Sequence, residues 1–165
     1  MNDRMRDFYM ALARNCATMS RATRLQVGCI IVKTDNIISF SWNGTPAGWD
    51  NTCEDKEYMD PSAGGWLNPD EIVVTWPFED SSGRYRLKTK PEVIHAERNA
   101  LDKLARSHAS GLGASLFVTH SPCVECAKSI YGAGIKTVYF QEDYRSLDGV
   151  YFLEKCGIDV VKLIK

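Results

Sequence analysis

The chain carries His95-Ala96-Glu97 and, further on, Pro122-Cys123-Val124-Glu125-Cys126, and we expect its other segments to fold around these two stretches. One imidazole and two thiolates make three protein ligands for zinc. A catalytic zinc has three protein ligands and a water, whereas a structural zinc fills all four positions with protein. We therefore expect His95, Cys123 and Cys126 to hold one catalytic zinc ion per chain.

Each of the two stretches is expected to begin a helix. Pro122 suits the first position of a helix and Ser121 can cap it, so Cys123 and Cys126 would share the first turn. A helix N-terminus stabilises negative charge and therefore favours thiolates there. The other helix is predicted over residues 92–107, and its apolar face would consist of Ala100, Leu101, Leu104 and Ala105.

His95 and Glu97 stand two positions apart, so they cannot lie on the same face of a helix. We expect His95 to turn toward the metal from the start of the helix while Glu97 reaches the pocket from the other side. Two thiolates cancel the charge of the zinc ion, which acidifies its water less than an all-histidine site would. A nearby carboxylate base therefore becomes useful.

Glu97 suits the role of this base, because H-x-E together with P-C-x-x-C is the signature of zinc deaminases. It would carry a proton from the zinc water to the ring nitrogen and the departing amine of a cytosine or adenine. The alternative is a structural zinc on the same histidine and cysteines, with Glu97 in solvent. A lone CxxC is common, but its combination with H-x-E favours the catalytic interpretation.

Length and composition favour one domain over residues 1–165. The net charge of −1 gives no basic surface for a nucleic-acid partner. The sequence has no long apolar run of the kind that would predict a signal peptide or a membrane span. The chain has six cysteines, and those outside the P-C-x-x-C motif lie mostly in apolar segments, as reduced core cysteines do. We therefore expect a cytoplasmic protein.

The first part of the chain predicts one helix and one hairpin. An Asn2 or Asp3 cap precedes apolar residues at helical spacing, which we expect to form a core stripe: Met5, Phe8, Tyr9, Leu12, Ala13, Cys16 and Met19. Residues 27–32 and 37–42 predict a β-hairpin covered on both faces. The glycines of residues 43–48 let backbone amides approach a ligand, and Asn43 can bond a sugar hydroxyl.

Residues 50–91 lack a clear periodicity and form a long, insertion-like loop. Within it, residues 71–76 and 84–90 are expected to pair as an extra hairpin around Asp80-Ser81-Ser82-Gly83. The segment also holds large aromatic residues, namely Trp66, Trp76 and Phe78. We expect them to pack on the domain or on a neighbouring subunit.

The second half alternates strands and helices. Strands are predicted at residues 115–119, 136–140 and 158–164, with the cysteine helix and a helix over residues 146–155 between them. This alternation argues for parallel pairing in an α/β layered fold. Ligands in such sheets sit beyond the carboxyl ends of the strands, which is where the zinc ligands fall.

The chain resembles the zinc-dependent cytidine and deoxycytidylate deaminases over nearly its whole length. The motifs that carry the resemblance are Arg24-Leu25-Gln26-Val27-Gly28, Trp42-Asn43-Gly44-Thr45-Pro46-Ala47-Gly48, His95-Ala96-Glu97-Arg98-Asn99-Ala100, Val118-Thr119-His120-Ser121-Pro122-Cys123 and Asp143-Tyr144-Arg145. The resemblance implies a three-layer cytidine deaminase-like fold, with a central mixed five-stranded sheet and helices on both faces. It also implies hydrolysis of dCMP to dUMP and ammonia, which supplies dUMP for thymidylate synthesis.

Members of this family are commonly hexamers activated by dCTP and inhibited by dTTP. The resemblance therefore implies a homo-oligomer, with a hexamer favoured, and an allosteric deoxynucleotide that binds with Mg²⁺. Carried over by position, Asn43 would touch the sugar, while Arg24, Tyr144 and Arg145 would hold the phosphate. Allosteric or backbone contacts would come from the glycine-rich segment, at Gly44, Thr45 and Gly48.

The chain departs from its relatives at a second, structural zinc site that many of them carry. Cys53 matches one ligand of that site, but Ala22 stands where a cysteine is expected and no histidine precedes His95. We therefore expect the second zinc to be absent. The long stretch of residues 50–91 also differs among relatives, and regulation can differ with it.

Alternatives exist both for single residues and for the function. Arg24 and Arg145 could form surface salt bridges, and His120 could line the pocket or take part in a hydrogen bond. Another nucleoside, nucleotide or tRNA-adenosine deaminase of the same fold is the main rival function, although the near-neutral charge disfavours tRNA. The other rival is a non-catalytic zinc protein that senses nucleotides. Glu97 disfavours it, because a binding module needs no proton carrier.

Overall fold

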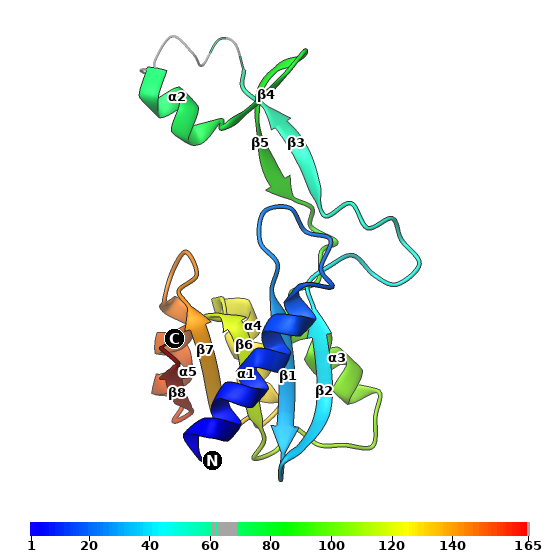
Figure 1. Cartoon of the computed structure of the whole chain (residues 1–165), viewed down its shortest axis with the longest axis vertical. Helices are drawn as coiled ribbons and strands as arrows, with labels where there is room; N and C mark the ends of the chain where they lie inside the picture. Colours follow the sequence, from blue (N-terminus) through cyan, green and yellow to red (C-terminus); the bar gives the residue numbers. More distant parts are fainter. Residues whose placement is uncertain (61, 63–68, 165) are drawn as a thin grey trace.

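The computed structural model describes residues 1–60, 62 and 69–164. A five-stranded sheet with the order β2-β1-β6-β7-β8 forms the middle layer of the body (Figure 1). β1 (Gly28–Lys33) pairs antiparallel with β2 (Asn36–Trp42) and with β6 (Ser115–His120). β7 (Thr137–Glu142) pairs parallel with both β6 and β8 (Asp159–Lys162). The mixed sheet and its parallel second half confirm the predicted fold class.

Helices cover both faces of this sheet, because successive strand residues point to opposite sides. One face packs against α1 (Asp3–Ala17) through Ile30, Val32, Phe117 and Tyr139. The other face packs against α3 (Ala96–Ala105), α4 (Val124–Gly132) and α5 (Asp148–Lys155). The strand residues buried on this second face are Cys29, Ile31, Leu116, Val118, Val138 and Phe140. The body is therefore a three-layer α/β/α unit.

The first helix begins as the sequence predicts, and most of its expected stripe faces the sheet: Tyr9 and Ala13 are buried there, and Met5, Leu12 and Cys16 are partly buried against the same cluster. The Asn2 side chain caps α1 by accepting a backbone amide at 2.9 Å. Phe8 and Met19, expected in the core, are 52% and 58% exposed, and the buried set is Tyr9, Met10, Ala13 and Ala17. Gly28 of β1 lets the backbone of α1 approach closely at Ala13, because a Cβ at Gly28 would stand 2.0 Å from the carbonyl oxygen of Ala13.

The predicted hairpin is present, with a two-residue turn at Thr34 and Asp35. Both residues have positive φ, at 49° and 60°, as a type I′ turn requires. β1 is buried on both faces, but β2 is the edge of the sheet, and its Ile37 and Phe40 are 44% and 53% exposed. The expectation of two covered faces is therefore wrong for β2.

Much of the insertion-like stretch forms an arm that projects from the body (Figure 1). Its strands β3 (Glu54–Tyr58), β4 (Phe78–Asp80) and β5 (Gly83–Thr89) make an antiparallel sheet in the order β3-β5-β4. The extra hairpin is therefore β4-β5, and its expected first strand at residues 71–76 is wrong. Most of that segment belongs to α2 (Pro69–Thr75), which has a proline and two acidic residues in its first turn.

Aromatic side chains pack within the arm. The ring of Tyr85 lies 5.5 Å from that of Tyr58 and 5.4 Å from that of Phe78, and Arg86 lies over the ring of Trp76. Tyr58 and Phe78 are still 41% and 42% exposed. Trp66 lies outside the described residues. Among the described helices, none is long and apolar enough to cross a lipid bilayer.

Candidate active site

His95 stands immediately before α3, as its N-cap residue, with extended backbone (φ −65°, ψ 152°). The helix expected from residue 92 therefore starts at Ala96. The reason is tertiary, because Ile94 exchanges backbone hydrogen bonds of 3.1 and 2.9 Å with Gly44 and cannot use those groups in a helix. Ser41 and Ser39 of β2 donate to carbonyl oxygens of α3, which fixes the helix on the sheet.

Cys123 holds the equivalent position before α4, again with extended backbone (φ −70°, ψ 167°), and Cys126 lies in the first turn. The expected helix start at Pro122, capped by Ser121, is therefore too early. The Ser121 hydroxyl instead accepts a hydrogen bond of 2.8 Å from the amide of Tyr144. Both helices thus begin at the end of the sheet where β6 ends, and each begins beside a metal-ligating side chain.

The three side chains meet at one point. Nδ1 of His95 lies 3.6 Å from Sγ of Cys123 and 3.5 Å from Sγ of Cys126, and the three atoms lie within 4.8 Å of one another. Zinc bonds of about 2.3 Å to sulfur and about 2.1 Å to nitrogen, at a tetrahedral angle, separate the two ligand atoms by about 3.6 Å. The spacing therefore fits a zinc ion. Across residues 1–60, 62 and 69–164 we find no second group of three metal-ligating side chains.

The electrostatics of this group favour a thiolate. Hydrogen bonds with Cys126 and His95 lower the pKa of Cys123 to about 3. For Cys126, the contact with Cys123 and the burial of the side chain raise the pKa of the thiol. The hydrogen bond to Cys123 also raises the pKa of His95. At least one sulfur is therefore charged at neutral pH, and the thiolate is the form that binds zinc.

Glu97 lies in the first turn of α3 and is 4% exposed. Burial raises the pKa of its carboxyl group to about 7, although contacts with its own backbone, with His95 and with Cys126 oppose the shift. Glu97 lines the same pocket as His95 and Cys123. A carboxyl group with such a pKa can both hold and release a proton near neutral pH.

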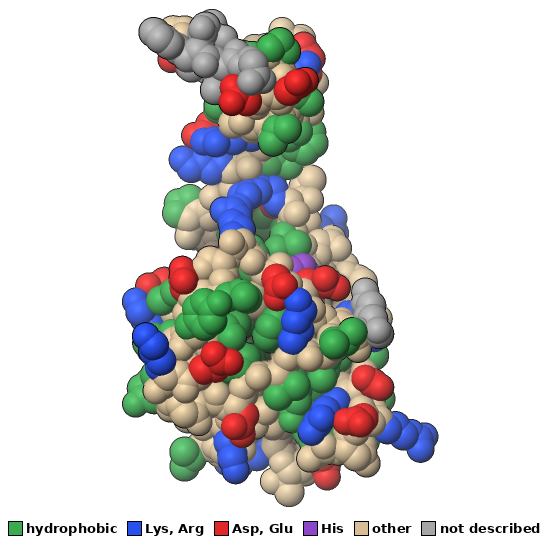
Figure 2. Space-filling view, turned by 90° about the vertical axis from the view of Figure 1, so that its left-hand side faces the viewer, with side chains coloured by type: hydrophobic (Ala, Val, Ile, Leu, Met, Phe, Trp, Pro, Cys, Tyr) green, Lys and Arg blue, Asp and Glu red, His purple; other side chains and the backbone are tan. Residues whose placement is uncertain are grey.

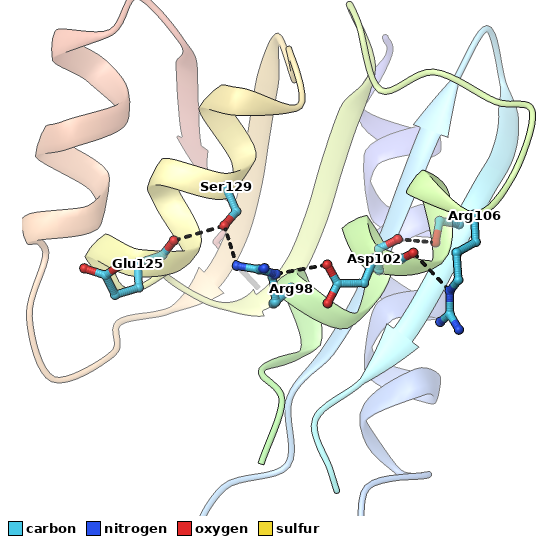
Figure 3. A network of polar contacts seen from close by, with 7 residues as sticks. Arg98, Asp102, Arg106, Glu125 and Ser129 are labelled. Carbon is cyan, nitrogen blue, oxygen red and sulfur yellow. Dashed lines mark hydrogen bonds and ion pairs between the residues drawn. The ribbon is translucent and has the colours of Figure 1, made fainter. Parts of the chain in front are cut away.

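Polar contacts join the two helices that carry these groups (Figure 3). Arg98 of α3 donates to Asp102 at 3.0 Å and to the hydroxyl of Ser129 on α4 at 3.3 Å. Ser129 in turn donates to the carbonyl oxygen of Glu125. A second support comes from α5, where a Cβ at Gly149 would stand 2.0 Å from the Pro122 carbonyl oxygen. The backbone before α4 therefore rests directly on α5.

A pocket of about 330 Å³ opens beside the cluster, and several expected substrate contacts line it. Its lining includes Arg24, Asn43, Tyr144 and Arg145 together with His95, Glu97 and Cys123. Figure 2 shows basic side chains gathered where the arm joins the body, above a histidine that reaches the surface. The structure thus brings the expected metal, proton-transfer and substrate residues to one place.

The glycine-rich segment uses hydrogen-bonding groups of Gly44 and Thr45 within the protein itself. Gly44 uses its amide and its carbonyl group to bond Ile94, and the Thr45 hydroxyl donates to the carbonyl oxygen of Asp50. Gly44, Thr45 and Gly48 are not among the lining residues of the pocket. Asn43 does line it, while its side chain accepts from the Val27 amide at 2.8 Å and donates to Leu25 at 2.9 Å. Asn43 therefore also shapes the pocket wall.

The two arginines of the pocket keep their charge available. The Arg145 guanidinium lies over the ring of Tyr144 at 5.6 Å, and Arg24 donates to the Thr89 hydroxyl at 3.0 Å. In the part of the chain that the structure describes, neither forms an ion pair within 4.0 Å. The salt-bridge alternative therefore finds no support among these residues.

Other polar residues also line the pocket; the sequence suggested such a place for His120 but gave no role to Glu54 or Thr89. His120, which has a hydrogen bond of 3.0 Å with Thr119, is half-buried, and burial lowers the pKa of its ring. Glu54 and Thr89 come from the arm and lie opposite each other in β3 and β5. Neighbouring residues give no signal for this pairing, because it depends on the register of two strands far apart in the sequence.

Comparisons with known proteins agree with this geometry. The profile of the cytidine and deoxycytidylate deaminase zinc-binding region matches residues 3–142. The solved dCMP deaminase of the cyanophage S-TIM5, in complex with dCMP and dUMP, is 35% identical, with a TM-score of 0.77 and 99% of both chains covered. The deoxycytidylate deaminase of Enterobacteria phage T4 is 32% identical over 168 residues, which cover 88% of this chain and 83% of that protein.

ComE operon protein 2 of Bacillus subtilis (strain 168) is 34% identical over 139 residues. The matched part covers 84% of this chain but only 60% of the Bacillus protein. The chain therefore spans most of the length of the phage proteins and less than two thirds of that bacterial relative.

Proposed function

Because this chain belongs to the cytidine and deoxycytidylate deaminase family, we propose that it hydrolyses dCMP to dUMP and ammonia in a zinc-dependent reaction. The observation that carries the proposal is the likeness to the S-TIM5 dCMP deaminase, solved with dCMP and dUMP, over 99% of both chains. The pocket supports it, since it combines a zinc-ligand cluster and a buried glutamate with two arginines free of ion pairs among the described residues.

His95, Cys123 and Cys126 would hold the zinc ion, since their spacing suits its tetrahedral ligand geometry. Zinc with three protein ligands keeps an open position, where it acidifies water for attack on the base. The supports around the ligands, from β2, α5 and the contact of Arg98 with Ser129, would keep the three side chains together. Rigid support matters because ligand distances must be correct within about 0.2 Å.

Glu97 would carry the proton. It would take one proton from the attacking water and pass it to N3 of cytosine, and would then take the second proton from the new C4 hydroxyl and pass it to the departing amine. The C4–N bond breaks, a C4 carbonyl forms, and one dCMP and one water give one dUMP and one ammonia. The buried position of Glu97 keeps bulk water away from this transfer.

The rest of the pocket would hold the nucleotide. Arg24 and Arg145 meet the 5′-phosphate, because the planar guanidinium can bond two phosphate oxygens at once. Tyr144 supports Arg145 through its ring, and Asn43 contacts the sugar with the hydrogen-bonding capacity left over from Leu25 and Val27. The substrate is then chosen by its phosphate as well as by its base.

An ammonia-release assay tests the substrate. Purified, zinc-loaded protein is given dCMP, deoxycytidine, dCTP, CMP and a tRNA stem-loop that contains adenosine, each separately, and initial rates are compared. The proposal expects dCMP to have the highest kcat/KM. A higher value for deoxycytidine would indicate a nucleoside deaminase, release of ammonia only from adenosine in a tRNA stem-loop would indicate a tRNA deaminase, and tight dCMP binding without turnover would indicate a sensor.

Assembly, regulation and location are finer proposals. A homo-oligomer, with a hexamer favoured by the family resemblance, would cover exposed apolar side chains of the arm such as Tyr58, Phe78 and Val74. Light scattering that finds a monomer at micromolar concentration would reject it.

If dCTP with Mg²⁺ activates and dTTP inhibits, added dCTP makes a sigmoidal dCMP curve hyperbolic. Cytoplasmic residence rests on cysteines that pack as small apolar residues, as Cys29 and Cys53 do.

A further inference from the structure

The base of the arm forms one wall of the pocket. Glu54 is the first residue of β3 and Thr89 is the last residue of β5, and the two lie opposite each other in the register of the small sheet. A backbone hydrogen bond of 3.0 Å from Lys90 to Cys53 continues this pairing toward the body. Both Glu54 and Thr89 line the pocket beside Arg24. The arm and the pocket therefore share residues.

Glu54 holds the backbone of the segment that carries Arg24. Its carboxylate accepts the amide of Thr23 at 3.1 and 3.2 Å and the amide of Arg24 at 3.1 Å. A carboxylate free in this pocket would repel a phosphate, but two backbone donors face this one. Hydrogen bonds to an ionised acceptor are stronger than those between neutral groups. Glu54 therefore fixes the start of the Arg24 side chain.

Thr89 orients the other end of the same side chain. Its hydroxyl oxygen accepts a hydrogen bond of 3.0 Å from Nη1 of Arg24. A hydroxyl partner leaves the guanidinium charge uncompensated, whereas an aspartate or glutamate would neutralise it and compete with an anionic ligand. A guanidinium group has five N–H donors, so the others stay available. Thr89 therefore fixes Arg24 while keeping it able to bind a phosphate.

Arg145 provides an internal comparison. It follows β7 on the body, and its guanidinium packs over Tyr144. No hydrogen bond to the arm is found for it among the described residues. Within the described part of the chain, Arg145 is thus held without a hydrogen bond from the arm, unlike Arg24.

We infer that Glu54 and Thr89 are positioning residues that hold Arg24 against the phosphate of the substrate, so that the arm helps to select a nucleotide over a nucleoside. The inference rests on the proposed function, because it requires a substrate with a 5′-phosphate. Losing one positioning hydrogen bond changes binding by a factor of about 2 to 10.

The test measures KM and kcat for dCMP and kcat/KM for deoxycytidine in the full-length, zinc-loaded protein. Thr89→Val removes the hydroxyl at nearly constant volume and should raise KM for dCMP about 2- to 10-fold, with kcat and the deoxycytidine rate unchanged. Thr89→Ser should restore the wild-type KM, because it keeps the acceptor oxygen. Thr75→Val, at the end of α2 on the same arm, is the matched control and should change nothing.

A double-mutant cycle identifies the partner. In an Arg24→Ala background, Thr89→Val should have no further effect on KM for dCMP, whereas in an Arg145→Ala background it should keep its full effect. Glu54→Ala should also raise KM for dCMP, and Glu54→Gln should raise it less, because the amide oxygen still accepts one backbone donor. Zinc content and the melting temperature establish that each variant is folded.

The outcomes separate the inference from the proposed function. Wild-type preference for dCMP combined with an unchanged KM in Thr89→Val would overturn the inference and leave the function in place. So would equal losses on dCMP and deoxycytidine, or additive effects of Thr89→Val and Arg24→Ala. A wild-type protein that does not deaminate dCMP would remove the proposed function, and this inference would fall with it.

Discussion

Gly149→Ala should damage the metal site from the neighbouring helix. The new Cβ would stand 2.0 Å from the Pro122 carbonyl oxygen and 2.8 Å from the Cys123 carbonyl carbon, although real Cβ atoms essentially never approach other atoms within 3.0 Å. Helix α5 or the Cys123 backbone must therefore move by about 1 Å. Such overpacking costs about 1 to 3 kcal/mol. Metal ligands tolerate errors of only about 0.2 Å, so we expect much of the cost to appear as lost zinc affinity.

The assay is zinc competition with a chromogenic chelator, beside thermal unfolding and dCMP turnover. A cost of 1 to 3 kcal/mol corresponds to a dissociation constant for zinc raised about 5- to 150-fold. Gly132→Ala is the matched control, because Gly132 ends α4 and a Cβ there meets no atom within 4 Å. That variant should keep zinc and be neutral or slightly more stable. Wild-type zinc affinity, melting temperature and turnover in Gly149→Ala would refute the reasoning.

Three other predictions concern the chemistry directly. Glu97→Ala should keep its zinc and lose turnover by about 10²- to 10⁴-fold, as metal analysis and steady-state kinetics would establish; activity near wild type would reassign the proton carrier. Arg145→Ala should lower kcat/KM for dCMP about 10- to 150-fold and hardly change that for deoxycytidine, because only dCMP has the phosphate; equal losses would make the arginine structural. Metal analysis should find one zinc per chain, and a value of two would contradict the expected absence of the second site.

The position of the metal cluster could be predicted because its signal is local. Two cysteines separated by two residues before a helix, and a histidine two residues before a glutamate, constrain the chemistry whatever surrounds them. The helix starts that the sequence predicts are too early for a tertiary reason. Ser121 and Ile94 look like parts of helix starts in sequence, but Tyr144 and Gly44 use their hydrogen-bonding groups in the fold.

The arm and the inner wall of the pocket could not be predicted in the same way. The β-branched run at Ile72, Val73 and Val74 favours a strand, yet the proline and acidic residues before it begin a helix. The contact of Thr89 with Arg24 joins residues 65 positions apart, and it depends on the register of β3 with β5. Likewise, Gly28 lets the α1 backbone at Ala13 lie close to β1, and in this orientation Phe8 is exposed. Helical periodicity alone cannot predict which side of the helix makes this close contact.

Deamination of dCMP in water enriched in ¹⁸O tests the central claim most directly, because hydrolysis must place a water oxygen at C4 of the product. Mass spectrometry of the nucleotide and an ammonia assay are made on the same sample. The account predicts dUMP with one ¹⁸O and one ammonia for each dUMP, from the zinc-loaded protein, and almost none from Glu97→Ala. Unchanged dCMP with the zinc-loaded protein, or dUMP formed as fast by Glu97→Ala, would contradict it.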